Sequence, residues 1–125
     1  MELEETTHRI IGCAYNVFKV LGYGFLESVY QKALLIELKK SGLKAEIEKP
    51  LMVYYLDQIV GYFAIDLLVE DAIILELKSV ENLSKAHEVQ LVNYLKGLEK
   101  DIGLLINFGP NGVDVKRKYR QPKNN

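Results

Sequence analysis

Apolar positions in the first third of the chain recur at the spacing of α-helices. In HRIIGCAYNVFKVL, residues 8–21, an apolar side chain returns every three or four positions, and Thr6-Thr7 are expected to cap the helix. Gly22 and Gly24 then interrupt the pattern. A second helix is predicted from about Leu26 to Ser41, with a broad buried face that includes Val29, Tyr30, Ala33, Leu34, Ile36 and Leu38.

From Ala45 onward the pattern becomes that of strands. AEIEKPLMVYYL (45–56) predicts an extended segment kinked or edged at Pro50, and IVGYFAIDLLV (59–69) and AIILELKSV (72–80) predict two further strands. Turns are expected at Asp57-Gln58 and Glu70-Asp71. The nearly continuous apolar character of these strands indicates a sheet covered on both faces, by helices.

The last third predicts a helix followed by two strands. The helix covers residues 83–99 with Ser84 as its cap, IGLLINFG (102–109) is a short buried strand, and VDVKRKYR (113–120) is a final edge strand. A helix that crosses between two strands implies at least one parallel pair in an otherwise antiparallel sheet.

Composition limits the classes of protein. The 125 residues fit one domain, with about 118–125 as a frayed basic tail. A net charge of −1 argues against a protein that coats nucleic acid through a large basic field, but leaves room for a local basic groove. The single cysteine, Cys13, excludes an internal disulfide, and two isolated histidines argue against a zinc site. The N-terminus is acidic and polar, and the apolar runs are too short to cross a bilayer, so we expect a cytoplasmic protein with no membrane partner.

Three charged residues interrupt the apolar hairpin DLLVEDAIILELK, residues 66–78. Glu76 and Lys78 share a face because side chains alternate along a strand. A two-residue loop at Glu70-Asp71 would pair Asp66 with Leu75, whereas a three-residue loop or a bulge would pair Asp66 with Glu76. Two facing carboxylates repel unless a cation lies between them, so we predict the odd-length loop or the bulge.

This arrangement suits a divalent cation. Mg²⁺ or Mn²⁺ takes hard oxygen ligands, here the carboxylates of Asp66 and Glu76 and the backbone carbonyl of Leu77, and phosphate and water complete the shell. Lys78 would orient a metal-activated water, which is the chemistry of phosphodiester hydrolysis. The alternative is a buried salt bridge between Lys78 and one carboxylate, but one lysine leaves the second acid uncompensated. The hairpin alone does not decide between the two interpretations.

Two helices add candidate residues. Gln90 and Tyr94 lie one turn apart on one helix face and could hold a phosphate, a base or a water, or be a solvated glutamine and a core tyrosine. Glu27 lies in the first turn of its helix, where it could be a further metal ligand or simply complement the helix dipole.

A strand Asp, a strand Glu-x-Lys and a helical Gln-x-x-x-Tyr together resemble the PD-(D/E)xK nuclease superfamily. GYGFLESVYQKAL, HEVQLVNYLK and GLLINFG are similar to blocks of a small prokaryotic family named for its G-x-x-E-x-x-Y or G-x-x-E-x-x-x-R signature. The resemblance runs from about Gly22 to Arg117. It implies an α/β, three-layer, restriction-endonuclease-like fold with a mixed central sheet flanked by helices. Ile65 replaces the proline that precedes the first motif acid, and Gln31 stands where the second signature has arginine.

Carried over position by position, the resemblance makes Glu27, Asp66 and Glu76 the metal-side acids, Lys78 the catalytic lysine, and Gln90 and Tyr94 the accessory pair. The first hypothesis is therefore a Mg²⁺-dependent nuclease with DNA preferred over RNA as substrate. Arg117 and Lys116, in the only concentrated basic run, are candidate nucleic-acid contacts, although charge can also protect an edge strand. The alternatives are a non-catalytic nucleic-acid-binding or protein-interaction module and a structural dimer with a buried ion-pair cluster. The small size is also compatible with a homodimer.

Overall fold

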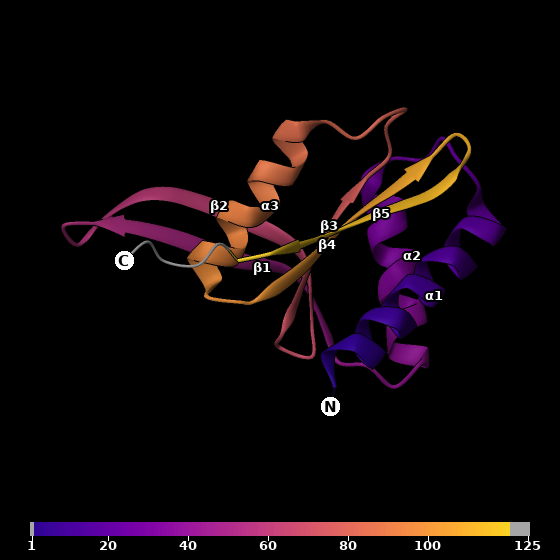
Figure 1. The fold of residues 1–125 in the computed structure, drawn as a ribbon, viewed down its shortest axis with the longest axis horizontal. Helices are drawn as coiled ribbons and strands as arrows, with labels where there is room; N and C mark the ends of the chain where they lie inside the picture. Colours follow the sequence, from indigo (N-terminus) through magenta and orange to yellow (C-terminus); the bar gives the residue numbers. More distant parts are fainter. Residues whose placement is uncertain (1, 121–125) are drawn as a thin grey trace.

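The computed structural model describes residues 2–120, which form a sheet with helices on both faces (Figure 1). The elements in chain order are α1 (Leu3–Leu21), α2 (Glu27–Lys40), β1 (Ala45–Tyr55), β2 (Gln58–Val69), β3 (Ile73–Lys78), α3 (Lys85–Leu98), β4 (Ile102–Gly109) and β5 (Gly112–Tyr119). Neighbouring strands in the sheet follow the order β1-β2-β3-β4-β5. Only the β3–β4 pair is parallel within these residues, and α3 makes the crossover, as the sequence predicted.

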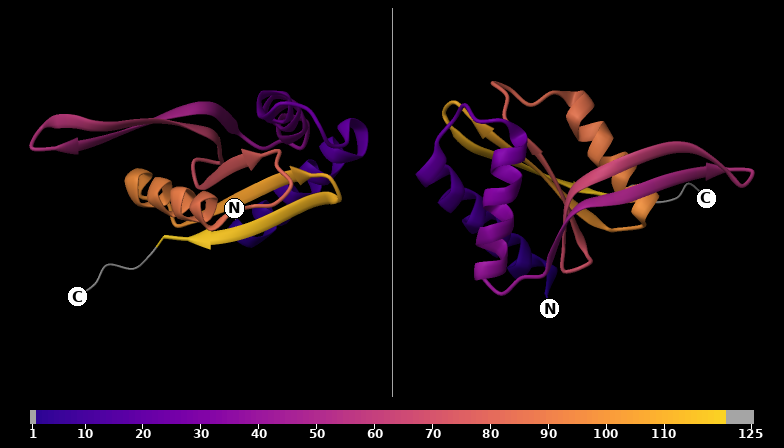
Figure 2. Two further views of the ribbon diagram at one scale, coloured as in Figure 1. Left: turned by 90° about the horizontal axis from the view of Figure 1, so that it is seen from above. Right: turned by 180° about the vertical axis from the view of Figure 1, so that it is seen from behind.

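Two hydrophobic clusters divide the core, one on each face of the sheet. The larger cluster joins α1 and α2 to the sheet through residues such as Ile10, Leu34 and Leu75. The smaller joins α3 to the other face through Leu91, Leu95 and neighbouring strand residues. Alternation along β3 sends Ile73 and Leu75 to the first cluster and Ile74 to the second. The result is three layers, with the sheet in the middle (Figure 2).

The helices differ from expectation in two places. The first helix begins at Leu3, so Thr6 and Thr7 are buried inside it and the predicted cap is wrong. Glu4 and Glu5 extend the helix because carboxylates are favourable in a first turn. In α2, Val29 and Ile36 are exposed, so the buried face is narrower than the sequence suggested. The prediction for α3 is confirmed, since Ser84 Oγ accepts a hydrogen bond from the N–H of His87.

The strands confirm their predicted order and correct two details. The first turn is Leu56-Asp57, not Asp57-Gln58, and both of its residues have positive φ angles, of 48° and 64°. Helices cover both faces of β2 only in its inner part, where Leu67, Leu68 and Val69 are buried. Residues 58–60 and 62–64 are exposed, because β1 and β2 continue past the body of the protein as a projecting hairpin (Figure 1).

Candidate metal and phosphodiester site

Asp66 and Glu76 come to face each other at the point where β2 and β3 separate. The hairpin pairs Leu67 with Leu75 and Val69 with Ile73, which leaves residues 70–72 as a three-residue loop. This register is the one predicted from the two acids, and it sets Asp66 opposite Glu76. Beyond Asp66, β2 pairs with β1 alone, so the two carboxylates lie at an opening in the sheet.

Each carboxylate is held by the backbone of the opposite strand. The N–H of Asp66 donates to Glu76 Oε1 at 3.1 Å, and the N–H of Leu77 donates to Asp66 Oδ2 at 2.8 Å. Within residues 2–120, the second oxygen of each carboxylate accepts no hydrogen bond from the protein. In an extended strand the N–H and C=O of one residue point the same way. The carbonyl of Leu77 therefore also faces the side on which Asp66 lies.

Burial and neighbouring negative charges raise the pKa of both acids. Burial raises the pKa of Asp66, the charge of Glu27 raises it further, and the Leu77 hydrogen bond and Lys78 oppose this. Burial and the facing Asp66 raise the pKa of Glu76 to about 8. At neutral pH the pair therefore retains a proton when no cation is bound, and a cation placed between the two carboxylates would relieve the same repulsion.

Lys78 lies at the end of β3 on the same face as Glu76, two residues along. Its charge lowers the pKa of both acids, which places its ammonium group in their neighbourhood. Yet no ion pair within 4.0 Å joins it to a carboxylate in the described part of the chain. A buried salt bridge therefore does not explain these three charged residues.

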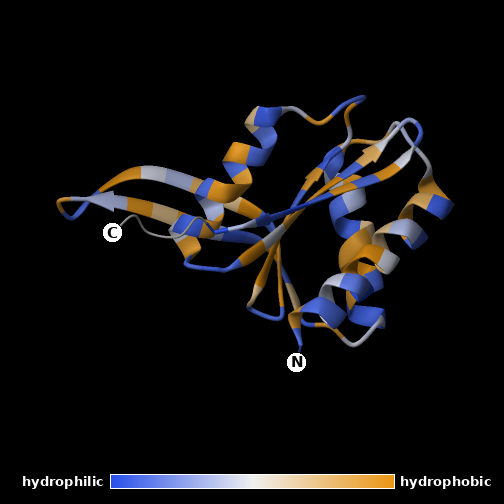
Figure 3. Cartoon of the chain, viewed as in Figure 1, coloured by the Kyte–Doolittle hydropathy of each residue, from blue (hydrophilic) through white to orange (hydrophobic). Residues whose placement is uncertain are grey.

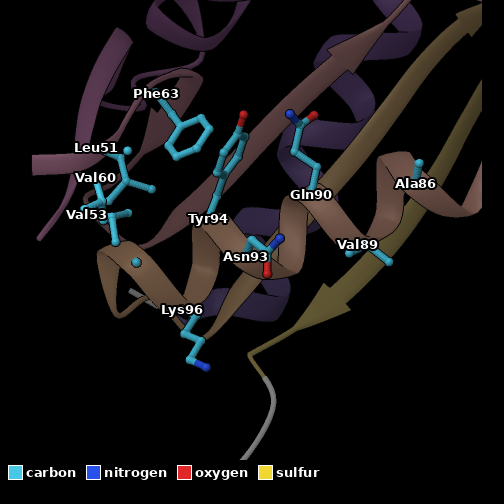
Figure 4. Close-up of a pocket in the computed structure, with 12 residues that line it drawn as sticks. Leu51, Val53, Val60, Phe63, Ala86, Val89, Gln90, Asn93, Tyr94 and Lys96 are labelled. Atoms are coloured by element: carbon cyan, nitrogen blue, oxygen red, sulfur yellow. The ribbon is translucent and has the colours of Figure 1, made fainter. Parts of the chain in front are cut away.

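Gln90 and Tyr94 project from the same side of α3, as Figure 4 shows. Tyr94 is 6% exposed and its ring centre lies 5.5 Å from that of Phe63 on β2. Burial raises the pKa of Tyr94, and the charges of Glu76 and Asp66 add to the effect, so the phenol lies close to the acids. Both residues line an apolar groove of about 730 Å³ between α3 and the projecting hairpin. The structure thus brings Tyr94 close to the carboxylates and places Gln90 beside it on the wall of the groove.

Glu27 is the first residue of α2 and is exposed. Its charge raises the pKa of both strand acids, so its carboxylate lies within electrostatic range of them. The loop before it is anchored by Tyr30, whose hydroxyl donates to the carbonyl of Gly22 at 2.5 Å and whose ring stacks on Phe108. Gly24, with φ of 118°, supplies a conformation that other residues rarely adopt. The spacing of Gly24, Glu27 and Tyr30 therefore fixes the position of Glu27 at the start of α2.

Sequence reasoning missed two residues beside Asp66. Gln31 of α2 is buried, and its Nε2 donates to the backbone carbonyl of Asp66 at 3.0 Å and to Glu48 Oε1 at 3.3 Å. Glu48 also raises the pKa of Asp66 through its charge. Glu48 has a φ of 54° within β1, a local break that alternation in the sequence does not signal. Gln31 thus holds the backbone of the first acid in place from inside the protein.

The basic run on β5 lies away from the acids. Arg117 forms an ion pair with Glu4 of α1, and its Nη1 lies 2.5 and 2.9 Å from the two carboxylate oxygens of Glu4. Lys118 forms an ion pair with Glu88 at 3.1 Å. Residues 118 and 119 belong to β5, so the predicted start of the frayed tail at about residue 118 is wrong. Lys116 is exposed on the same strand, which is two places from β3 in the sheet. The structure does not bring Arg117 to the candidate site, and residues 121–125 lie outside the described part of the chain.

The donor set fits a hard divalent cation with an incomplete protein shell. In residues 2–120 no three Asp, Glu, His or Cys side chains are gathered closely enough to enclose a metal ion. Mg²⁺, however, is commonly bound through one or two carboxylates, with waters and substrate phosphates at the other positions. Asp66 and Glu76 match that requirement, since each keeps one oxygen free of protein hydrogen bonds.

A mixed sheet between helices, with a carboxylate pair where an antiparallel hairpin opens, defines the restriction-endonuclease-like class of α/β folds. A family model described as the PD-(D/E)XK nuclease superfamily matches residues 4–119. The chain belongs to this superfamily, whose members are generally nucleases and typically use divalent metal ions.

Comparison with solved structures gives the same fold. The chain is similar to the crystal structure of SSO0001, with a TM-score of 0.60 and 18% sequence identity. The likeness covers 77% of this chain and 50% of that one, so the present chain corresponds to half of the longer protein. No curated protein matches the chain. None of the helices in residues 2–120 combines the length and apolar character needed to span a membrane.

Proposed function

We propose that the protein is a divalent-metal-dependent nuclease that hydrolyses phosphodiester bonds, with DNA preferred over RNA. The observation that carries this proposal is the facing pair Asp66 and Glu76, each hydrogen-bonded to the opposite strand and each with a raised pKa. A buried and a half-buried acid that face each other are costly to fold, and groups with such perturbed pKa values cluster at functional sites. Because the chain belongs to the nuclease superfamily, the chemistry that we propose for these acids is phosphodiester hydrolysis.

The proposed site divides its roles among few residues. Asp66, Glu76 and the Leu77 carbonyl would hold Mg²⁺ or Mn²⁺, with Glu27 supporting through a bound water. When bound, the ion supplies charge neutralisation at the phosphorus and lowers the pKa of a coordinated water. Lys78, free of an ion pair in the described residues, orients the attacking water and stabilises developing negative charge. Gln90 and Tyr94 donate hydrogen bonds to substrate or water at the mouth of the groove.

We also place the chain in the small prokaryotic family with the G-x-x-E-x-x-Y signature, represented here by Gly24, Glu27 and Tyr30. The support is structural. Gly24 has a positive φ, and Tyr30 ties the loop to Gly22, so that Glu27 begins its helix beside the acid pair. A signature that positions an acid is what a metal-dependent site requires.

The test is metal binding measured together with cleavage. Mn²⁺ is titrated by calorimetry into the wild type, Asp66→Asn and the control Asp57→Asn, whose carboxylate lies in the exposed hairpin turn. The same preparations are then assayed on labelled single- and double-stranded DNA and RNA. We expect binding and cleavage in the wild type and the control, and loss of both in Asp66→Asn. Wild-type protein that binds no Mn²⁺, with or without nucleic acid, overturns the proposal.

A second candidate is a non-catalytic protein-interaction module on the same fold. The observation in its favour is charge. From Pro50 to Leu77 the chain contains no lysine, arginine or histidine, so Lys78 is the nearest cation to the acids in the sequence. A nuclease that acts alone usually presents more positive surface to its polyanionic substrate. Cleavage of nucleic acid that depends on Asp66 would rule this candidate out.

A further inference from the structure

The outer part of the β1–β2 hairpin, residues 51–63, forms an arm that exposes apolar side chains. Nothing in the described chain covers the end of this arm, which projects beyond α3 (Figure 2), and apolar segments follow it to its tip (Figure 3). Its exposed large apolar residues are Met52, Val53, Tyr54, Tyr55, Leu56, Ile59, Val60, Tyr62 and Phe63, between 39% and 77% exposed. The arm is thus as apolar as a strand buried between helices, but no element of the described chain packs on its end.

The arm also carries an open sheet edge. In the described residues β1 is the end strand of the sheet and pairs only with β2. Proteins normally protect such an edge with charges, prolines or a covering loop. Pro50 stands at the base of the arm and a bulge shifts the β1–β2 register between Val53 and Tyr54, but residues 51–55 contain neither a charge nor a proline. Backbone groups on the outer side of this segment therefore remain available to another strand.

Charge identifies the kind of partner. No basic residue lies between Pro50 and Leu77, and Asp57 at the tip is negative. A nucleic-acid strand needs cations along its phosphates, which the arm lacks. Uncharged strand edges and apolar side chains fit a protein strand of the same character.

The size of the surface fits a dimer. Aromatic side chains bury about 150–250 Å² each, so the exposed parts of these residues amount to on the order of 1,000 Å². A stable interface buries roughly 800 Å² per partner, and monomers rarely expose apolar patches of this extent. An antiparallel pair of identical strands is produced directly by a twofold axis, so one edge can satisfy itself.

We propose that the arm is a homodimer interface, in which β1 pairs antiparallel with β1 of a second copy. A pairing centred on Val53 sets the uncharged residues 51–55 against each other. Lys49 then lies near the partner's Asp57, in the turn that follows β1. No like charges meet in this register, and two symmetry-related opposite-charge pairs form. The proposal concerns a surface apart from the acid pair, and it holds whether or not the protein cuts nucleic acid.

The first test is the molar mass in solution, measured by light scattering and sedimentation over a wide concentration range. We expect twice the chain mass of 14.3 kDa for the wild type. Tyr54→Lys combined with Ile59→Lys places charges on two residues that pair across the hairpin, and should give a monomer. The matched control is Val20→Lys, at an apolar residue of α1 that is 82% exposed, and it should stay dimeric. Circular dichroism and thermal unfolding verify that each variant is folded.

The second test needs no variant. Hydrogen exchange of the amides in residues 51–55 is followed at protein concentrations above and below the dimer transition. We expect slower exchange in these residues at high concentration and no change in β4. A wild type that is monomeric throughout, a dimer that survives the double lysine variant, or protection by a single-stranded oligonucleotide in the monomer would each overturn the proposal.

Discussion

The carboxylate of Glu76 accepts a hydrogen bond from the backbone N–H of Asp66, directly across the point where β2 leaves β3. Burial and the facing charge of Asp66 raise the pKa of Glu76 to about 8, although this hydrogen bond itself lowers it. The folded protein therefore binds a proton that the unfolded chain, with an ordinary glutamate pKa of about 4.3, releases at neutral pH. Stability and metal binding should both depend on that proton.

The pH dependence of stability follows from the sign of the shift. Because the pKa is raised on folding, the stabilisation is fully present below the pKa of the unfolded chain and is lost as pH rises toward about 8. Without metal, we expect the unfolding free energy of the wild type to fall between pH 5 and 8, by up to about 1.4 kcal/mol per pH unit. Urea unfolding of wild type and Glu76→Gln at several pH values measures the difference.

Glu76→Gln lacks this contribution, so its unfolding free energy should change less with pH. At pH 8 its unfolding free energy should be higher than that of the wild type. Glu81→Gln, which changes an exposed acid outside the pair, should follow the wild-type curve. Parallel curves for the wild type and Glu76→Gln would show that Glu76 does not carry the proton.

Metal affinity should rise with pH over the same range. An ion that binds both carboxylates must displace the shared proton, so its apparent affinity should increase by about tenfold per pH unit below pH 8. Calorimetry with Mn²⁺ at pH 6, 7 and 8, in buffers of different ionisation enthalpy, measures both the affinity and the number of protons released. Release of no proton would contradict binding at this pair.

Lys78→Ala separates binding from catalysis. The lysine makes no ion pair with the acids in the described chain, so its removal should change Mn²⁺ affinity only a few-fold. Cleavage should fall by about 10²-fold or more, because a donor to developing charge is lost. Lys32→Ala, at an exposed lysine of α2, is the control and should cut at the wild-type rate. Equal losses of binding and cleavage in Lys78→Ala would make this residue a structural partner of the acids.

The close packing of α3 on the sheet gives a stability prediction. A Cβ added at Gly103 would lie 2.8 Å from Leu91 Cδ1 and 3.2 Å from the carbonyl oxygen of Ile74, which cannot move away easily. Gly103→Ala should therefore destabilise the protein by about 1–3 kcal/mol. Gly12→Ala, where a Cβ has nothing within 4 Å and the residue lies inside α1, should instead stabilise by about 0.5–1 kcal/mol. Thermal and urea unfolding of both variants checks the opposite signs.

Much of the site could be predicted because it depends on the period of a strand. Asp66, Glu76 and Lys78 can share their chemistry only if the loop is odd, and the loop at 70–72 has that length. The exposure of the β1–β2 arm could not be predicted in this way. Alternation identifies a strand with apolar faces, but not whether another element of the same chain covers them.

Of the two helical residues beside the acids, the sequence predicted a role for Tyr94 but not for Gln31. Tyr94 was accessible to sequence reasoning, because Gln90 and Tyr94 are one turn apart on one helix. The position of Gln31 was not, since its hydrogen bonds run to Asp66, 35 residues away, and to a Glu48 that adopts a positive φ. Contacts between distant elements, and a backbone irregularity without glycine, leave no periodic trace in the sequence.

Variants of Gln31 can distinguish a purely structural role from a role in positioning Asp66 for metal binding. Its amide holds the Asp66 carbonyl and Glu48 together from inside the protein, so Gln31→Leu leaves a buried carbonyl without its donor. We expect a loss of about 1–3 kcal/mol in stability. Mn²⁺ affinity should fall by about 10–100-fold, because Asp66 is no longer held in position.

Lys32→Leu, on the exposed side of the same helix, provides the control and should alter neither quantity. A purely structural role for Gln31 would lower the melting temperature while Mn²⁺ affinity, measured well below that temperature, stayed at the wild-type value. A positioning role lowers both. Gln31→Glu sharpens the distinction, because it keeps the side-chain size but adds a carboxylate beside Asp66 and Glu48. Repulsion should then raise the pKa of Asp66 further and weaken Mn²⁺ binding most at low pH.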